Sequence, residues 1–214
     1  MCIRDSVYAY GGPVDDYRSQ AMLERALRNP APGVTFRMLD MDRYEAEVDT
    51  LTDILNDAWR DNWGFTPTTE EETRHLAKAM RPIVDRRLIW FAEIDGETAG
   101  VLVVLPNINE AIEGLGGKLL PFGWAKLLWR LKVRGLKTLR VPLMGVRRAH
   151  ARTVRGRMLP FQLIAAAAAE ARKLGYERYE FSWILEDNHA MRRICDALGA
   201  GPYKTYRIYE KALG

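Results

Sequence analysis

The chain has 214 residues, of which 48% are hydrophobic and 28% charged, and its formal net charge is +4. This length and composition are typical of a globular domain with a sizeable core and exclude a disordered protein. No apolar run approaches the roughly 18 residues of a membrane span, and the first twenty residues lack a signal-peptide pattern, so we expect a cytoplasmic protein with no transmembrane segment. Two distant cysteines and three dispersed histidines match no disulfide framework or metal-ligand spacing, so no metal is expected.

The first 33 residues predict an appendage to the main domain. Residues 1–6 fit nothing downstream and resemble a translated adapter remnant. A strand end, a Gly-Gly-Pro break, a helix and a proline-rich connector follow at residues 7–10, 11–13, 17–27 and 29–33. We interpret residues 1–33 as the tail of a missing upstream domain plus a linker, and residues 34–214 as the domain itself.

Residues 34–105 predict a strand, two helices and then two strands. A short strand at residues 34–39 precedes a helix that Asp40 or Asp42 can cap and that runs to Trp59, with apolar residues spaced by three and four. Thr69 and Glu72 form a capping box that opens a second helix, which ends near Pro82. Two strands, at residues 87–94 and 98–105, are joined by the hairpin signal Asp95-Gly96.

An insertion follows at about residues 106–137. Its second half predicts a helix with an apolar face, Trp124 to Leu131, and basic residues elsewhere. No Asp or Glu occurs between Glu113 and Glu170, where twelve Lys or Arg residues fall. Such a block attracts phosphates, nucleic acid or a lipid surface, or it is simply a solvated face. For the apolar face, covering the sheet is preferred over a membrane contact or an oligomer interface, and nucleic acid is the least favoured partner because no nucleic-acid motif accompanies the block.

After the insertion the pattern predicts a strand, a nearly all-apolar helix, a strand, a helix and a final strand, at residues 138–146, 158–174, 178–184, 188–198 and 203–209. The whole order is β-α-α-β-β-(insert)-β-α-β-α-β. It predicts an α/β (α+β) fold with a mixed, mostly antiparallel central sheet and helices on both faces.

That order, and the residues at one junction, resemble the GNAT superfamily of N-acetyltransferases over about residues 34–213. In the family a strand leads into Arg/Gln-x-x-Gly-x-Gly/Ala and then a helix; here the same place holds Arg155-Gly156-Arg157-Met158-Leu159-Pro160. Asn62-Trp63-Gly64-Phe65 and Ser182 to Asn188 resemble a bacterial branch in which such a domain often follows another. Met158 and Pro160 stand where the family has glycines, and Pro160 removes one N–H donor, although we expect it in the first helical turn.

The resemblance implies acetyl-CoA or another acyl-CoA as co-substrate. Its pyrophosphate would bind at the helix N-terminus, with arginines offsetting the missing glycines. The implied cofactor-binding residues are Met144, Gly145, Val146, Arg152, Arg155, Gly156, Arg157, Met158 and Asn188.

Four residues are candidates for acid–base chemistry. Glu186 follows a strand and is the preferred general base for a protonated amine. Cys195 stands where the family often has a tyrosine that acts as the general acid, although packing is the more common role of a cysteine on an apolar helical face. Tyr206 is an alternative hydroxyl donor, as is Tyr203, although a tyrosine on a terminal strand is usually part of the core or its rim. For the acceptor pocket we expect Trp59, Asn62, Trp63, Phe65, Asn109 and Trp183.

We therefore expect an acyl-CoA-dependent N-acyltransferase that acylates a primary amine of a small molecule or peptide. Two alternatives stay open: a non-catalytic GNAT-like module serving an adjacent domain or partner, and an acyl or aminoacyl transferase with another donor. A homo-oligomer or tandem-domain arrangement is also open.

Overall fold

The computed structural model describes residues 2–28 and 30–211, and a single β-sheet lies at its centre. Within these residues the sheet has seven strands in the order β2-β3-β4-β5-β6-β1-β7, and every neighbouring pair is antiparallel except β5 and β6. The strands are β1 (Cys2–Pro13), β2 (Val34–Met38), β3 (Ile89–Ile94), β4 (Glu97–Pro106), β5 (Thr138–Val146), β6 (Arg178–Leu185) and β7 (Gly201–Glu210). The expected mixed, mostly antiparallel sheet is confirmed.

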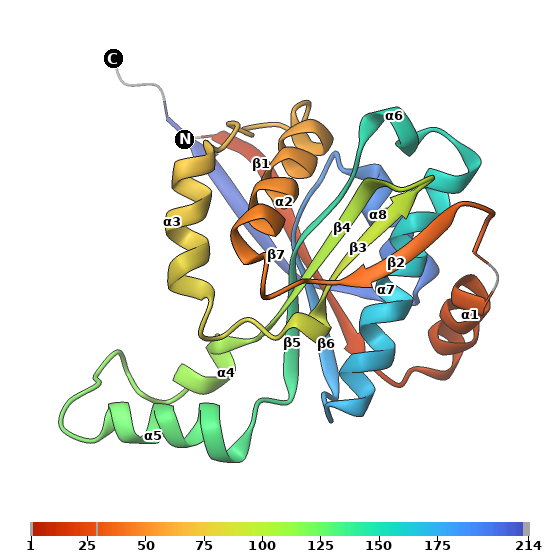
Figure 1. The fold of residues 1–214 in the computed structure, drawn as a ribbon. Helices are drawn as coiled ribbons and strands as arrows, with labels where there is room; N and C mark the ends of the chain where they lie inside the picture. The colour runs from red at the N-terminus through yellow and green to blue at the C-terminus, as the bar shows by residue number, and fades with distance from the viewer. Residues whose placement is uncertain (1, 29, 212–214) are drawn as a thin grey trace.

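Helices lie on both faces of this sheet (Figure 1). They are α1 (Tyr17–Arg28), α2 (Tyr44–Trp59), α3 (Glu70–Met80), α4 (Ile108–Ile112), α5 (Gly123–Trp129), α6 (Arg148–Ala151), α7 (Val154–Lys173) and α8 (His189–Ala197), with a short 3₁₀ helix η1 (Arg86–Leu88) and a short π-helix η2 (Arg130–Arg134). No helix in the described part of the chain is long and apolar enough to cross a membrane.

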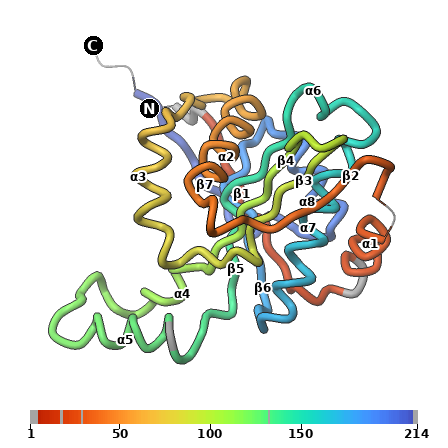
Figure 2. Tube along the Cα trace, in the orientation of Figure 1, coloured from red at the N-terminus to blue at the C-terminus, as the bar shows by residue number. Residues whose placement is uncertain are grey.

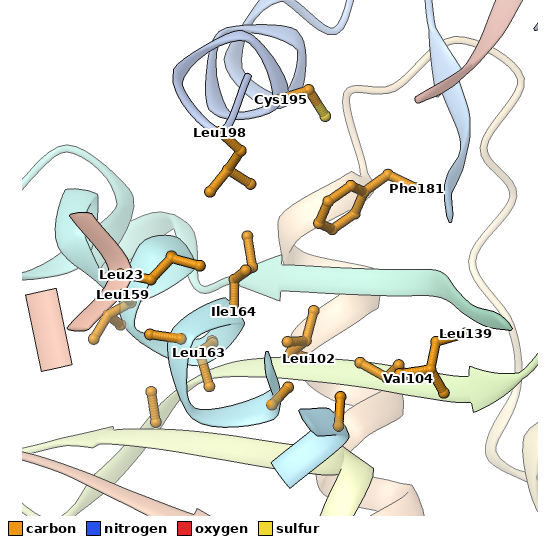
Figure 3. Packing of buried hydrophobic residues seen from close by; sticks show 14 of the residues in the cluster. Leu23, Leu102, Val104, Leu139, Leu159, Leu163, Ile164, Phe181, Cys195 and Leu198 are labelled. Carbon is orange, nitrogen blue, oxygen red and sulfur yellow. The ribbon is translucent and has the colours of Figure 1, made fainter. Parts of the chain in front are cut away.

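The central strands are apolar on both sides because each side packs against a helical layer. Along β4, Val101 and Val103 belong to the core under α2, whereas Leu102 and Val104 belong to the core under α1, α7 and α8. This is the two-residue alternation of a strand buried on both faces. Figure 3 shows the second core, where Leu163 of α7 lies close to Leu102.

Two turn predictions are confirmed with their physical cause. Asp95 and Gly96 both have positive φ, 53° and 88°, which is the backbone of a type I′ hairpin. Thr69 caps α3: its side chain accepts from the Glu72 N–H at 3.2 Å, and the Glu72 carboxylate accepts from the Thr69 N–H at 2.9 Å. By contrast, neither Asp40 nor Asp42 caps α2, whose N-cap is Arg43 without a side-chain hydrogen bond.

The expectation that residues 1–33 lie outside the domain is wrong for the residues that are described. β1 pairs with β6 on one side and β7 on the other, and α1 packs against α7 (Figure 2). The Gly11-Gly12-Pro13 break is also wrong, because the strand continues through it. A Cβ at Gly11 would sit 2.9 Å from the Tyr179 carbonyl oxygen, so glycine is needed there for the close approach of β6.

Two helices differ from expectation. α7 begins at Val154, four residues before the predicted start, because Thr153 caps it by accepting from the Gly156 N–H at 3.0 Å. Pro160 is therefore the seventh residue of the helix and not in its first turn. The apolar face around α5 does not cover the sheet: none of the seven residues of α5, all of them described, is buried.

Candidate active site: the cleft between β5 and β6

The parallel ladder between β5 and β6 is short. It joins Thr138–Val141 to Arg178–Phe181 and then stops, although β5 continues to Val146 and β6 to Leu185. Pro142 follows the last paired residue of β5 and has no N–H to donate, so it cannot extend a ladder. The two strands consequently leave unpaired backbone edges facing a common space.

That space is a cleft of about 630 Å³. Its walls come from five parts of the chain: the end of α2 with the turn after it, the second half of β5, the second half of β6, the start of α7, and α8. A volume of this size is in the range of cofactor and small-molecule sites.

Aromatic residues at the end of α2 form one wall. The Trp59 indole N–H donates to the Met144 carbonyl of β5 at 3.0 Å, which fixes the ring against the strand. Phe65 packs edge-on against Trp59, with ring centroids 6.0 Å apart. Asn62 and Trp63 lie in the intervening turn and also line the cleft.

The N-terminal end of α7 forms a second wall. Gly156 is buried there, and a Cβ at this position would collide with the carbonyl oxygen of His150 in α6. The first N–H groups of a helix have no partner within the helix, and its dipole is positive at this end. Pro160, further along α7, lines the cleft and leaves the Gly156 carbonyl without its usual helical donor.

The arginines around this end of α7 differ in their ion-pair partners. Arg147 and Arg148 form ion pairs with α2 and the turn after it, at 2.7 Å to Asp53 and 2.8 Å to Asp61. Arg155 forms an ion pair with Asp95 at 2.8 Å in the β3–β4 hairpin.

The side chains of Arg152 and Arg157, both exposed, have neither a hydrogen-bond nor an ion-pair partner among the described residues, and Arg157 lines the cleft. Arg157 is therefore the cation available to a ligand there.

A buried carboxylate lies beside the cleft, on β6. Glu180 is only 7% exposed and accepts hydrogen bonds from Ser182, at 2.5 Å, and from the hydroxyl of Tyr203. The Arg140 guanidinium donates to Ser182 at 2.8 Å and lies 3.5 Å from Glu180, and Lys204 lies 3.8 Å from the same carboxylate. Burial alone would raise the pKa of Glu180, but the hydrogen bonds from Ser182 and Tyr203 and the two nearby charges hold that pKa below its ordinary value.

Ser182 connects this network to the cleft, since it lines the cleft and bonds Glu180. Trp183, the next residue, is 64% exposed at the cleft wall and contacts Tyr206, with ring centroids 6.0 Å apart. Phe181 and Ile184 both face the core although they are three residues apart, so the strand's alternation shifts between them. Within the described residues, no group of three or more His, Cys, Asp or Glu is placed to hold a metal ion.

Several solved structures with a similar fold are named as acetyltransferases. A GCN5-related N-acetyltransferase from Sphaerobacter thermophilus matches with a TM-score of 0.60 and 15% identity, over 96% of this chain and 51% of that chain. The putative acetyltransferase yncA from Salmonella typhimurium, solved with acetyl-CoA, matches with a TM-score of 0.50 and 18% identity, over 78% and 79% of the two chains. The fold is that of the GCN5-related N-acetyltransferases, or GNAT fold.

Two curated relatives are much closer in sequence. The "bacterial ceramide synthase" of Caulobacter vibrioides is 62% identical over 189 residues, which are 88% of this chain and 49% of the relative. "Protein YghO" of Escherichia coli K12 is 44% identical over 180 residues, which are 84% of this chain and 46% of the relative. The chain thus spans about half the length of these relatives. No protein-family model matches it.

Within the GNAT fold, most of the predicted binding residues line one cleft. Of the predicted cofactor residues these are Met144, Gly145, Val146, Gly156, Arg157 and Asn188, and of the predicted acceptor residues Trp59, Asn62, Trp63, Phe65 and Trp183. Arg152 and Met158 are exposed near the α7 N-terminus without lining the cleft. Asn109 is elsewhere: it lies in α4, beside the start of β5, whereas the cleft lies along that strand's second half.

The predicted acid–base residues are placed less favourably. Glu186 is exposed, does not line the cleft and accepts from the Tyr8 hydroxyl at 3.0 Å; hydrogen bonds from Ser6 and Tyr8 lower the pKa of its carboxyl. Cys195 is fully buried, where Figure 3 shows it beside Phe181 and Leu198. Burial raises the pKa of its thiol to about 12, which agrees with the packing interpretation.

The network of Glu180, Ser182 and Arg140 was missed by sequence reasoning. Its signal was a pair of polar residues two apart on one face of an otherwise apolar strand, Tyr-Glu-Phe-Ser-Trp at residues 179–183. Such a pair predicts a buried polar cluster only once it is known which strands of the sheet supply its partners.

Proposed function

We propose that this chain is the acyl-CoA-binding part of an N-acyltransferase that transfers an acyl group from a CoA thioester to a primary amine. The observation that carries the proposal is the cleft between β5 and β6, bounded by the N-terminal end of α7. It supplies unpaired strand edges for an extended thioester arm and a positive helix end for phosphate.

Arg157 is the proposed phosphate contact within this cleft. It lines the cleft, and its guanidinium has no hydrogen-bond or ion-pair partner among the described residues, whereas the Arg155 side chain forms an ion pair with Asp95. A guanidinium binds phosphate more strongly than a neutral N–H does, so it offsets the two glycines that the family has at the positions of Met158 and Pro160, which lie within α7 here.

The acceptor that we propose is the amine of a long-chain amino alcohol. The relative that is 62% identical is named a ceramide synthase, and a ceramide is the amide of such an amine. The aromatic wall of Trp59, Trp63 and Phe65 and the exposed Trp183 give the cleft apolar surface that suits hydrocarbon.

The reaction forms a bond between the amine nitrogen and the thioester carbonyl carbon and breaks the carbon–sulfur bond. We propose that Ser182 takes a proton from the amine as its own proton passes to Glu180, in place of the predicted base Glu186, which does not line the cleft. Arg140 orients Ser182 through its 2.8 Å hydrogen bond. The leaving thiolate takes a proton. Tyr206 does not itself line the cleft, but its ring packs against Trp183 of the cleft wall, and it is the proposed donor of that proton.

The test compares two arginine variants by calorimetry with acetyl-CoA and a long-chain acyl-CoA. Arg157→Ala is expected to weaken binding about ten-fold or more, because it removes a charge-assisted contact to phosphate. Arg155→Ala is the matched control, two residues away on the same helix, and is expected to leave the affinity nearly unchanged.

Product formation is measured separately, by mass spectrometry of the amide and by release of the CoA thiol, with a long-chain amino alcohol as acceptor. No heat at millimolar acyl-CoA with a folded protein would overturn the donor assignment. Binding without amide formation would restrict the proposal to the donor half, and equal affinities of the two arginine variants would remove Arg157 from it.

A further inference from the structure

Residues 113–137, which we call the excursion, leave the sheet after β4 and return to it at β5. Their base is fixed: the Glu110 carboxylate accepts from the backbone N–H groups of Lys137 and Thr138, each at 2.9 Å. The Arg130 guanidinium donates to the carbonyls of Ala111 at 2.7 Å and Glu113 at 2.5 Å. The excursion is therefore held in a defined place on the domain.

Its surface is unusually apolar. Figures 1 and 2 show α5 standing away from the sheet, below α3, beyond the ends of β4 and β5. Between 49% and 79% of each of seven large hydrophobic side chains is exposed, in Leu119, Leu120, Phe122, Trp124, Leu128, Trp129 and Val133. Scattered exposed hydrophobic residues are ordinary, but so many within fifteen positions of one chain segment mark an interaction surface.

The charges around this surface have one sign. No acidic residue occurs from residue 114 to 169, and Lys118, Lys126 and Arg134 are exposed within the excursion. Lysine is depleted at the centres of protein–protein interfaces, whereas Lys and Arg beside Trp, Phe and Leu are the composition of helices that lie in the boundary of a bilayer.

We propose that the excursion binds the surface of an anionic lipid bilayer. The side chains of Trp124, Leu128 and Phe122 enter the boundary between headgroups and acyl chains, and the exposed Lys and Arg side chains contact lipid phosphates. The helical part, residues 123–134, is about 18 Å long, well short of the roughly 30 Å hydrocarbon core, so it lies on the membrane and does not cross it.

This membrane contact does not depend on the transferred group or on the acceptor. If the acceptor is the long-chain amine proposed above, the same contact brings the domain to the surface in which such an amine resides. The basic charge also favours an anionic bilayer over a second copy of this chain, because a two-fold contact between two excursions would bring their positive charges together.

The test is co-sedimentation of the purified chain with vesicles of phosphatidylglycerol and phosphatidylcholine in equal parts, and with vesicles of phosphatidylcholine alone. We expect binding to the first, weaker binding to the second, and a decrease as salt rises. The double variant Trp124→Ser with Leu128→Ser is expected to lower the partition coefficient on the order of ten-fold or more. Lys126→Ala with Arg134→Ala is expected to lower it about five-fold per side chain.

Tyr209→Ser is the matched control, because Tyr209 is an exposed aromatic residue, 56% accessible, on β7. It is expected to bind vesicles like the unchanged chain, and circular dichroism checks that every variant is folded. Absence of binding to anionic vesicles, or equal loss in the control, would overturn the proposal. Self-association that the Trp124 and Leu128 changes abolish, without vesicle binding, would overturn it in favour of a second copy.

Discussion

Replacing Glu180 by glutamine is the sharpest test of the buried network beside the cleft. The change keeps the size of the side chain and removes its charge. In the native chain two hydroxyls, of Ser182 and Tyr203, donate to the carboxylate, and Arg140 and Lys204 lie 3.5 and 3.8 Å from it. In Glu180→Gln one of these hydroxyls faces an amide N–H₂, and both cations lose the negative charge beside them, although Arg140 keeps its hydrogen bond to Ser182.

The magnitude follows from these contacts. A hydrogen bond to a charged group contributes roughly 1.5–3 kcal/mol, and the loss of one partner of a buried ion pair costs about 3–5 kcal/mol. Lys204 is about half exposed, so its share is small. We therefore expect Glu180→Gln to lower the free energy of unfolding by about 2–3 kcal/mol at neutral pH, and each kcal/mol lowers Tm by about 2–4 °C in a domain of this size.

The effect has a defined pH dependence. Because the folded-state pKa of Glu180 is lowered, its carboxylate stabilises the fold above the ordinary carboxyl pKa, and this stabilisation is lost as the pH falls through the folded-state value. The difference between the native chain and Glu180→Gln should be largest at neutral pH and shrink on acidification below the ordinary carboxyl pKa.

Urea unfolding at a series of pH values measures the difference. Glu186→Gln is the control, since Glu186 is an exposed carboxylate near the same strand, and it should change stability less. With an active preparation, Glu180→Gln should also slow amide formation by about 10²-fold or more and flatten the acidic limb of the pH–rate profile, unlike Glu186→Gln. A stability difference that does not change with pH, or a larger effect of Glu186→Gln, would refute the assignment.

Two further predictions concern the packing around the cleft. Gly156→Ala should destabilise the domain by roughly 1–3 kcal/mol and weaken acyl-CoA binding, because the added Cβ collides with the backbone carbonyl of His150; Gly201→Ala, where a Cβ meets nothing within 4 Å, is the control, and equal melting temperatures would contradict the reasoning. In a Cys2→Ser background, Cys195 should react with a thiol reagent at pH 8 far more slowly in the native state than in urea. A pKa of about 12 leaves roughly one thiolate in 10⁴ at that pH, and the side chain is fully buried, so rapid labelling of the folded chain would show that this part of the core opens.

Local signals in the sequence were sufficient for much of the fold. The Asp95-Gly96 turn and the Thr69–Glu72 capping box are confirmed because each depends on the conformation and hydrogen bonds of a few consecutive residues. The order of strands and helices from residue 34 onward, and the mixed sheet that it implies, follow from apolar periodicity in the same way.

Long-range pairing decided the rest. The sequence of β1 reads as a strand end broken by two glycines, yet the strand continues because β6 and β7 approach it from both sides. The start of α7 was misplaced because the Thr153 cap was not recognised, so Pro160 was expected in the first turn. Which arginine is available at the cleft depends on where Asp53, Asp61 and Asp95 lie in space, and no spacing along the chain encodes that.

The sequence by itself determined the layered sheet and the aromatic and glycine residues that line the cleft, because those features are encoded in short patterns. Only the tertiary structure brought Arg140, Glu180 and Tyr203 together from three strands. It also left the apolar side chains around α5 uncovered. A buried charge needs partners and an apolar helix face needs a cover, but the chain positions that supply or withhold them are set by the fold.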